Sequence, residues 1–159
     1  MRKRGLFFLI FFILLSKIML AIDFNLTRIS PQGEYDNGDG VEYQLTLTNN
    51  TAIGIGGTLS FPLANLTSTL DGGGEGIIFN NLQNSSKTNG KYTYPGSFSF
   101  TGNLEATGIF IDAGGSITYT VKGTINPNIN GTIDAIANFV STSGEKITQE
   151  NTMTRAFTI

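Results

Sequence analysis

The sequence predicts an all-β protein, an antiparallel β-sandwich of about seven to nine strands. Three stretches, residues 41–48, 116–125 and 132–140, alternate apolar and polar side chains, which is typical of strands with one buried and one solvated face. Turn residues recur at intervals of about eight to twelve positions, as they do in β-sandwiches. No stretch has the sustained period of an amphipathic helix. The expected core therefore lies between two sheets.

The strand at residues 41–48 is expected at the centre of a sheet, because Val41, Tyr43, Leu45 and Leu47 alternate strictly with polar residues between two turn signals. An edge strand is expected before it, and a strand interrupted by Gly54, Gly56 and Gly57 after it, where glycines indicate a bulge or a close backbone approach. The other expected strands are residues 22–29, 53–61, 77–79, 91–94, 97–101, 107–111, 116–125, 132–140 and 146–159.

Other features of the sequence are turn signals, a polar segment and the expected direction of particular side chains. Residues 71–76 form a glycine-rich loop, and residues 80–87 are polar and expected to be exposed. Asn89-Gly90 is typical of a tight hairpin turn. Phe98 and Phe100 are expected to face inward, and the small residues Ala135 and Ala137 indicate a crowded central strand.

Residues 1–21 have the three parts of a secretory signal: basic residues at 2–4, an apolar run at 6–15, and a segment ending in Ala21. We expect cleavage after Ala21, which leaves residues 22–159 as one β-sandwich domain. If the segment is not cleaved, it is the chain's only expected contact with the membrane. The predicted location is secreted or at the cell surface.

The mature chain carries six basic and twelve acidic residues, a net charge of −6. Nucleic-acid binding is therefore not expected, because it depends on neutralising phosphates with Lys and Arg. The chain has no Cys, so the domain depends on packing and not on disulfides. A chain of this length can bury a core of its own.

Three motifs resemble, in order, the immunoglobulin-like conserved repeat domain of large bacterial surface proteins. The first is residues 38–49 (GDGVEYQLTLTN), the second residues 111–121 (IDAGGSITYTV) and the third residues 131–138 (GTIDAIAN). The resemblance implies an immunoglobulin-like sandwich, often in tandem, at the cell surface. It carries no catalytic residues. Residues 59–62 (LSFP) lack the acidic residue that often precedes the proline in that family.

Candidate chemical sites are few. Without His or Cys the chain has no Ser-His-Asp or Cys-His triad and none of the usual zinc ligands, so we expect neither enzyme activity nor a cofactor. Asp36 and Asp39 flank a glycine-rich turn and are the closest-spaced pair of carboxylates that could act as catalysts, although turn-forming residues are the expected interpretation. Ligation of a calcium ion is the third hypothesis, but the distal Glu of a calcium loop is missing. Tyr35, Tyr92 and Tyr94 are either core residues or an exposed binding patch.

Two functions from different classes follow. The first is a non-catalytic structural spacer or protein-adhesion module that associates with a protein partner or a neighbouring module, through an edge strand such as residues 152–159. The second is a small carbohydrate-binding sandwich that uses Tyr92 and Tyr94. The absence of Trp weakens the second hypothesis, because stacking on sugar rings then depends on Tyr and Phe.

Overall fold

The computed structural model describes residues 22–62, 65–66, 76–87, 92–100, 103–127, 129 and 131–156. The predicted signal segment (residues 1–21), most of the glycine-rich loop (residues 71–75), and the turn at Asn89-Gly90 lie outside the described residues. The described residues include no helix with the length and apolar character needed to span a bilayer.

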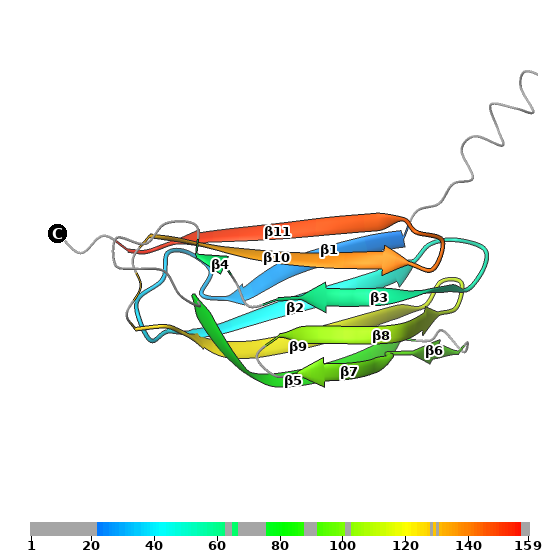
Figure 1. The fold of residues 1–159 in the computed structure, drawn as a ribbon, viewed down its shortest axis with the longest axis horizontal. Coiled ribbons are helices and arrows are strands. Elements are labelled where there is room, and N and C mark those ends of the chain that lie inside the picture. Colours follow the sequence, from blue (N-terminus) through cyan, green and yellow to red (C-terminus); the bar gives the residue numbers. More distant parts are fainter. Residues whose placement is uncertain are drawn as a thin grey trace, which may run out of the picture.

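The described chain forms two antiparallel sheets packed face to face, so the predicted β-sandwich is confirmed (Figure 1). The four-stranded sheet has the order β1 (Ile22–Ser30), β2 (Gly40–Asn49), β9 (Ser116–Ile125), β5 (Ile77–Lys87). The seven-stranded sheet has the order β11 (Lys146–Thr154), β10 (Thr132–Ser141), β3 (Ile55–Phe61), β8 (Leu104–Ile111), β6 (Thr93–Tyr94), with β4 (Asn65–Leu66) paired to β10 and β7 (Ser97–Phe100) to β8. Of these described strands, β4 has no counterpart among the strands expected from the sequence.

The predicted central strand is β2, which lies between β1 and β9. Leu45 is opposite Leu26 on β1 and Tyr119 on β9, and all three side chains are buried. The polar residues between the buried ones face outward, as the two-residue period requires. The alternation seen in the sequence therefore sets which face of the four-stranded sheet meets the core.

Aromatic rings from both sheets interlock in the core. The Tyr43 ring of β2 meets the Phe61 ring of β3 at a centroid distance of 5.6 Å, and Phe61 meets Phe79 of β5 at 5.2 Å. Such edge-to-face and tilted contacts add to the stabilisation from burial alone. Burial raises the pKa of the Tyr43 phenol above its usual value, partly opposed by the nearby Arg28 guanidinium. The phenol therefore stays protonated at neutral pH.

The glycines of β3 have the close contacts predicted for them. A β-carbon on Gly57 would lie 2.3 Å from the Phe139 ring and 2.6 Å from the Val140 carbonyl oxygen, which is too close for any side chain. The pairing of β3 with β8 also shifts register between Gly57 and Leu59. Gly57 thus lets β3 and β10 approach closely, and the buried Ala137 of β10 fits the predicted crowding at the centre of the sheet.

β5 extends beyond the predicted strand at residues 77–79, since it continues to Lys87 and pairs with β9. Most of the described side chains from 80 to 85 are exposed, as predicted, although Leu82 packs against the core. One prediction about β7 needs correction. Phe98 is on the same face as its buried partner Ala106, but its side chain is 47% exposed. β7 is at the sheet margin, so the other sheet does not cover Phe98, whereas Phe100 packs against the core.

The boundaries of the other strands differ from the predicted ones by only a few residues. β8 begins at Leu104 and not at residue 107, because residues 104–106 pair with β3 on one side and with β7 on the other. β9 has the predicted bounds, β10 extends one residue further to Ser141, and β11 ends at Thr154. Phe157 and Ile159, which belong to the predicted last strand, lie outside the described residues.

Asn49 joins the two sheets at one end of the sandwich. Its buried side-chain amide donates hydrogen bonds to the carbonyl oxygens of Ile53, at 2.7 Å, and of Ile111 at the end of β8, at 2.8 Å. Its side-chain oxygen accepts from the backbone N–H of Thr51 at 2.9 Å. Every polar group of this buried side chain is therefore used, although the sequence suggested only a turn at this position.

Candidate functional site

The turn at Asp36 and Asp39 is held by hydrogen bonds within the chain. The Asp39 carboxylate accepts from the backbone N–H of Asp36 at 2.8 Å, and the Asp39 backbone N–H donates to the Asp36 carbonyl at 3.1 Å. Gly38 takes a φ of 87°, which glycine adopts without strain. The Gly38 N–H and the Asp39 carbonyl also bond to Ile125 of β9. This geometry is that of a structural turn, the expected interpretation of these residues.

Ionisable groups are dispersed over the described part of the molecule. No group of three or more carboxylates gathers there in a way that could hold a metal ion. Lys122 and Glu42 form a cross-strand ion pair with a distance of 3.1 Å between Nζ and Oε2, on the exposed face of the four-stranded sheet. An exposed pair of this kind adds little stability.

The three tyrosines of the sequence hypothesis divide between core and surface. Tyr35 is fully buried, and its hydroxyl donates to the Gly131 carbonyl at 3.0 Å. Its backbone also pairs with the end of β11: the Tyr35 N–H donates to Thr154, and the Ala156 N–H donates to Tyr35. Tyr92 and Tyr94, by contrast, are 64% and 41% exposed. Of the three tyrosines, only Tyr92 and Tyr94 are therefore exposed enough to belong to a binding patch.

An aromatic face, which we define as Tyr92, Tyr94 and Phe110, lies on the outer side of the seven-stranded sheet at β6 and β8. Tyr94 is the cross-strand partner of Phe110, and the Tyr92 and Phe110 rings are 6.0 Å apart with an interplanar angle of 37°. The Phe110 ring lies against Gly54, where an added β-carbon would be only 2.4 Å from it. The absence of a side chain at Gly54 therefore provides the space that this ring occupies.

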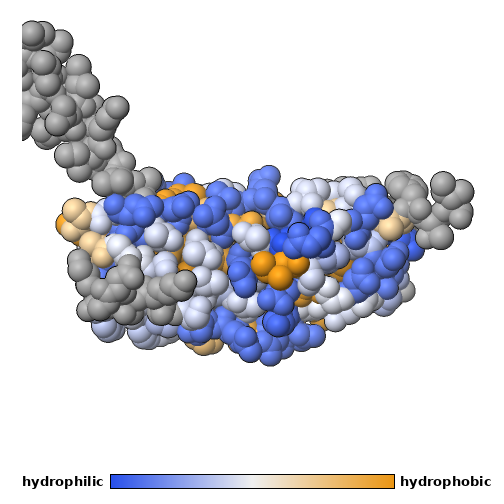
Figure 2. Space-filling model, turned by 180° about the vertical axis from the view of Figure 1, so that it is seen from behind, coloured by the Kyte–Doolittle hydropathy of each residue, from blue (hydrophilic) through white to orange (hydrophobic). Residues whose placement is uncertain are grey.

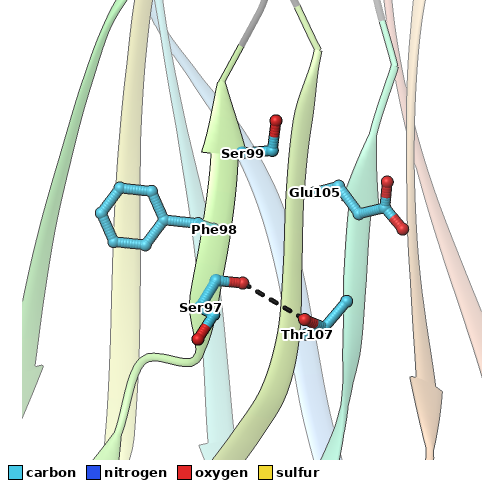
Figure 3. Close-up of a pocket in the computed structure, with 5 residues that line it drawn as sticks. All are labelled: Ser97, Phe98, Ser99, Glu105 and Thr107. Carbon is cyan, nitrogen blue, oxygen red and sulfur yellow. Dashed lines mark hydrogen bonds between the residues drawn. The ribbon is translucent and has the colours of Figure 1, made fainter.

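A hydroxyl hollow adjoins this face along β7 and β8. It is shallow and open, has a volume of about 400 Å³, and is lined by Ser97, Phe98, Ser99, Glu105 and Thr107. Figure 3 shows Phe98 pointing away from the side chains of Ser99, Glu105 and Thr107. The Tyr94 hydroxyl is 3.4 Å from Ser97 Oγ, so the hollow and the aromatic face are contiguous.

The sequence reasoning identified Tyr92 and Tyr94 but missed Phe110 and the hydroxyl hollow. The available signal for Phe110 was its place between Ile109 and Ile111, because one of three successive apolar residues on a strand must point to the opposite side from its neighbours. Both isoleucines are buried, and Phe110 is 36% exposed. The hollow had no such signal, since it depends on how β7 pairs with β8.

The side of the molecule opposite the aromatic face has fewer features of a binding site. Figure 2 shows it covered mainly by hydrophilic and intermediate residues, with the hydrophobic atoms in small separate groups. Scattered apolar atoms of this kind are normal on the surface of a folded domain.

The fold is similar to domains of bacterial surface proteins. The collagen-binding domain of a Staphylococcus aureus adhesin matches with a TM-score of 0.55 and 10% identity, over 85% of this chain and 99% of that one. The Streptococcus pneumoniae pilus backbone RrgB matches with a TM-score of 0.51 and 13% identity, over 76% of this chain. The match covers 52% of the pilus backbone chain, or about half its length.

An enzyme also shares this fold. AvmM, which catalyses macrocyclization in alchivemycin A biosynthesis, matches with a TM-score of 0.51 and 9% identity, over 86% of this chain and 91% of that one. No family model and no curated protein matches the chain. At these identities the likeness shows a shared fold, and function has to be argued from the residues of this chain.

Proposed function

We propose that this chain is a secreted or cell-surface, non-catalytic immunoglobulin-like module that acts as a structural spacer or as a unit of protein-protein adhesion. The observation that best supports this proposal is the direction in which the chain runs through the sandwich. It enters the sandwich at the start of β1, at one end of the long axis, and leaves after β11 near the other end (Figure 1). Modules with this geometry extend a protein lengthwise when they are joined head to tail.

The interior supports the same proposal. The core is continuous from sheet to sheet and is lined by fully buried apolar and aromatic side chains. Burial raises the pKa of the Tyr119 phenol, whose hydroxyl donates to the Pro95 carbonyl, so this phenol is protonated and engaged in a structural bond. The buried ring groups therefore serve packing. The likeness to pilus-backbone and adhesin folds agrees with such a mechanical role.

Export is the first test of this proposal. Expression of the full chain with a C-terminal epitope tag in a bacterium should place the tag outside the cytoplasm, on a protein whose first residue is Ile22, because residues 1–21 have the composition of a secretory signal. Mass spectrometry of the exported form and antibody labelling of whole cells measure this. The control is the same chain with Leu9 and Ile13 changed to Asp, which should stay inside. An intact Met1 on a protein confined to the cytoplasm would contradict the proposal.

Association through an edge strand is the second part of the proposal, and β5 is the edge best suited to it. The expected edge, β11, carries the exposed Lys146 and Glu150, and its last backbone groups are already paired with Tyr35. Charges and covering segments protect a sheet edge from pairing. β5 is also terminal in its sheet, and it has no charged residue from position 77 to position 86. Its backbone can therefore accept an extended partner strand more easily.

Charged substitutions distinguish the two edges. We expect Asn84→Lys on β5 to reduce self-association or partner binding at least tenfold, and Thr148→Lys on β11 to leave it within about twofold, because Lys disfavours edge pairing. Both side chains are exposed, so the folded state should tolerate either change. Sedimentation velocity of the exported protein over a range of concentrations is the measurement. Loss of association in the β11 variant alone would transfer the role to β11.

A further inference from the structure

We propose that the aromatic face and the hydroxyl hollow together form a binding site for a neutral saccharide. The site runs along the outer side of β6, β7 and β8, with the exposed rings at one end and the hydroxyl groups at the other. It goes beyond the structural role proposed above and does not depend on it.

The aromatic face supplies the apolar half of such a site. Sugar rings present faces of C–H groups that pack on aromatic rings, and Tyr and Phe offer this area while restricting only two side-chain torsions. Tyr92, Tyr94 and Phe110 keep 64%, 41% and 36% of their surface exposed. Neighbouring rings support one another, since Tyr92 and Phe110 are 6.0 Å apart. The surface is therefore held in shape before a ligand arrives.

The hydroxyl hollow supplies the polar half. Thr107 Oγ1 donates to the Ser97 carbonyl at 3.4 Å, and the Tyr94 hydroxyl is 3.4 Å from Ser97 Oγ. Both distances are at the long limit for a hydrogen bond, so these groups retain capacity for stronger bonds to a ligand. Ser99 and Glu105 are opposite each other across β7 and β8 and are exposed. A carboxylate and several hydroxyls match the vicinal hydroxyl groups of a sugar.

The charge distribution favours a neutral ligand. Among the described residues that make up the two surfaces, Glu105 is the only charged side chain, so nothing there complements an anion. Asp112, two residues after Phe110, adds a second carboxylate beside the rings, because its backbone N–H donates to the Tyr92 carbonyl at 3.2 Å. Carboxylates repel an anionic ligand but accept hydrogen bonds from sugar hydroxyls. The hollow is shallow and open along the strands, which suits the interior of a polysaccharide chain better than a buried end group.

Affinity electrophoresis in gels that contain soluble starch, laminarin, hydroxyethylcellulose or xylan tests the proposal with the purified full-length export product. We expect at least one of these polymers to retard the protein. Isothermal titration with a tetrasaccharide of that polymer should then show that Tyr94→Ala weakens binding at least tenfold, because it removes a stacking ring. Tyr94→Phe should keep most of the affinity, and Thr107→Val should weaken binding severalfold through the loss of one hydroxyl.

Ile78→Ala is the matched control, because Ile78 is 49% exposed on β5 of the other sheet. It should bind as the unchanged protein does, and circular dichroism should show all four variants folded. Retardation by none of the four polymers would overturn the proposal. Equal effects of Tyr94→Ala and Ile78→Ala would also overturn it. So would a protein ligand, such as soluble collagen, that binds the unchanged protein, loses affinity in Tyr94→Ala and is not displaced by the tetrasaccharides.

Discussion

Leu45→Asp is expected to leave the protein unfolded at room temperature. Leu45 is fully buried in β2 between Leu26 and Tyr119, so the new carboxylate would have no partner and no access to water. Removing the leucine side chain alone costs about 2–5 kcal/mol, and burial of an unpaired charge or of its neutralised form adds several more. Domains of this size are stable by only about 5–15 kcal/mol in total.

Circular dichroism and urea unfolding measure this effect. The matched control is Gln44→Asp, which introduces the same carboxylate one position away on the outward face of β2. It should change the free energy of unfolding by no more than about 1 kcal/mol, because its side chain remains in contact with water. A cooperative transition of Leu45→Asp at the same urea concentration as the unchanged protein would show that the structure of β2 is wrong.

Asn49→Ala is expected to lower the free energy of unfolding by about 2–4 kcal/mol. The substitution removes the two hydrogen bonds to Ile53 and Ile111 and the acceptor of the Thr51 N–H, all at a buried position. A buried polar group that loses its partner costs about 1–3 kcal/mol. The link between β2 and β8 across the sandwich is lost at the same time.

Two further variants separate this explanation from general sensitivity of the turn. Asn49→Asp keeps the size and the acceptor oxygen but places a carboxylate oxygen against the two carbonyls, so it should destabilise at least as strongly as Asn49→Ala. Asn50→Ala, at the exposed neighbouring position, should change stability by less than about 0.5 kcal/mol. Equal and small effects of all three substitutions in urea unfolding would show that Asn49 does not join the sheets.

Asn49 also shows how a local motif can mislead. It begins an Asn-x-Ser/Thr triplet, as do Asn25, Asn65, Asn84 and Asn130. A glycan on Asn49 would require its amide nitrogen to leave two hydrogen bonds in the buried space between the sheets. The triplet at this position therefore has a structural role, because Thr51 donates two hydrogen bonds to the side-chain oxygen of Asn49.

The sequence by itself determined the class of fold and the strands of the core. The alternation in β2, β9 and β10 was sufficient because the two faces of these strands meet different environments, one apolar and one aqueous, and each residue type follows its environment. The glycines of β3 were informative for a similar reason, since a missing side chain signals close approach.

Only the tertiary structure decided the edges and the candidate site. β5 was predicted only over residues 77–79, because an edge strand can be polar on both faces, so its backbone pairing with β9 beyond Phe79 leaves little pattern in the side chains. The same limit applies to Phe98, whose inward direction was predictable but whose exposure depends on how far the other sheet reaches. The contact between the aromatic face and the hydroxyl hollow arises from the pairing of β6 and β7 with one strand, β8, and such pairing is set by contacts between distant parts of the chain.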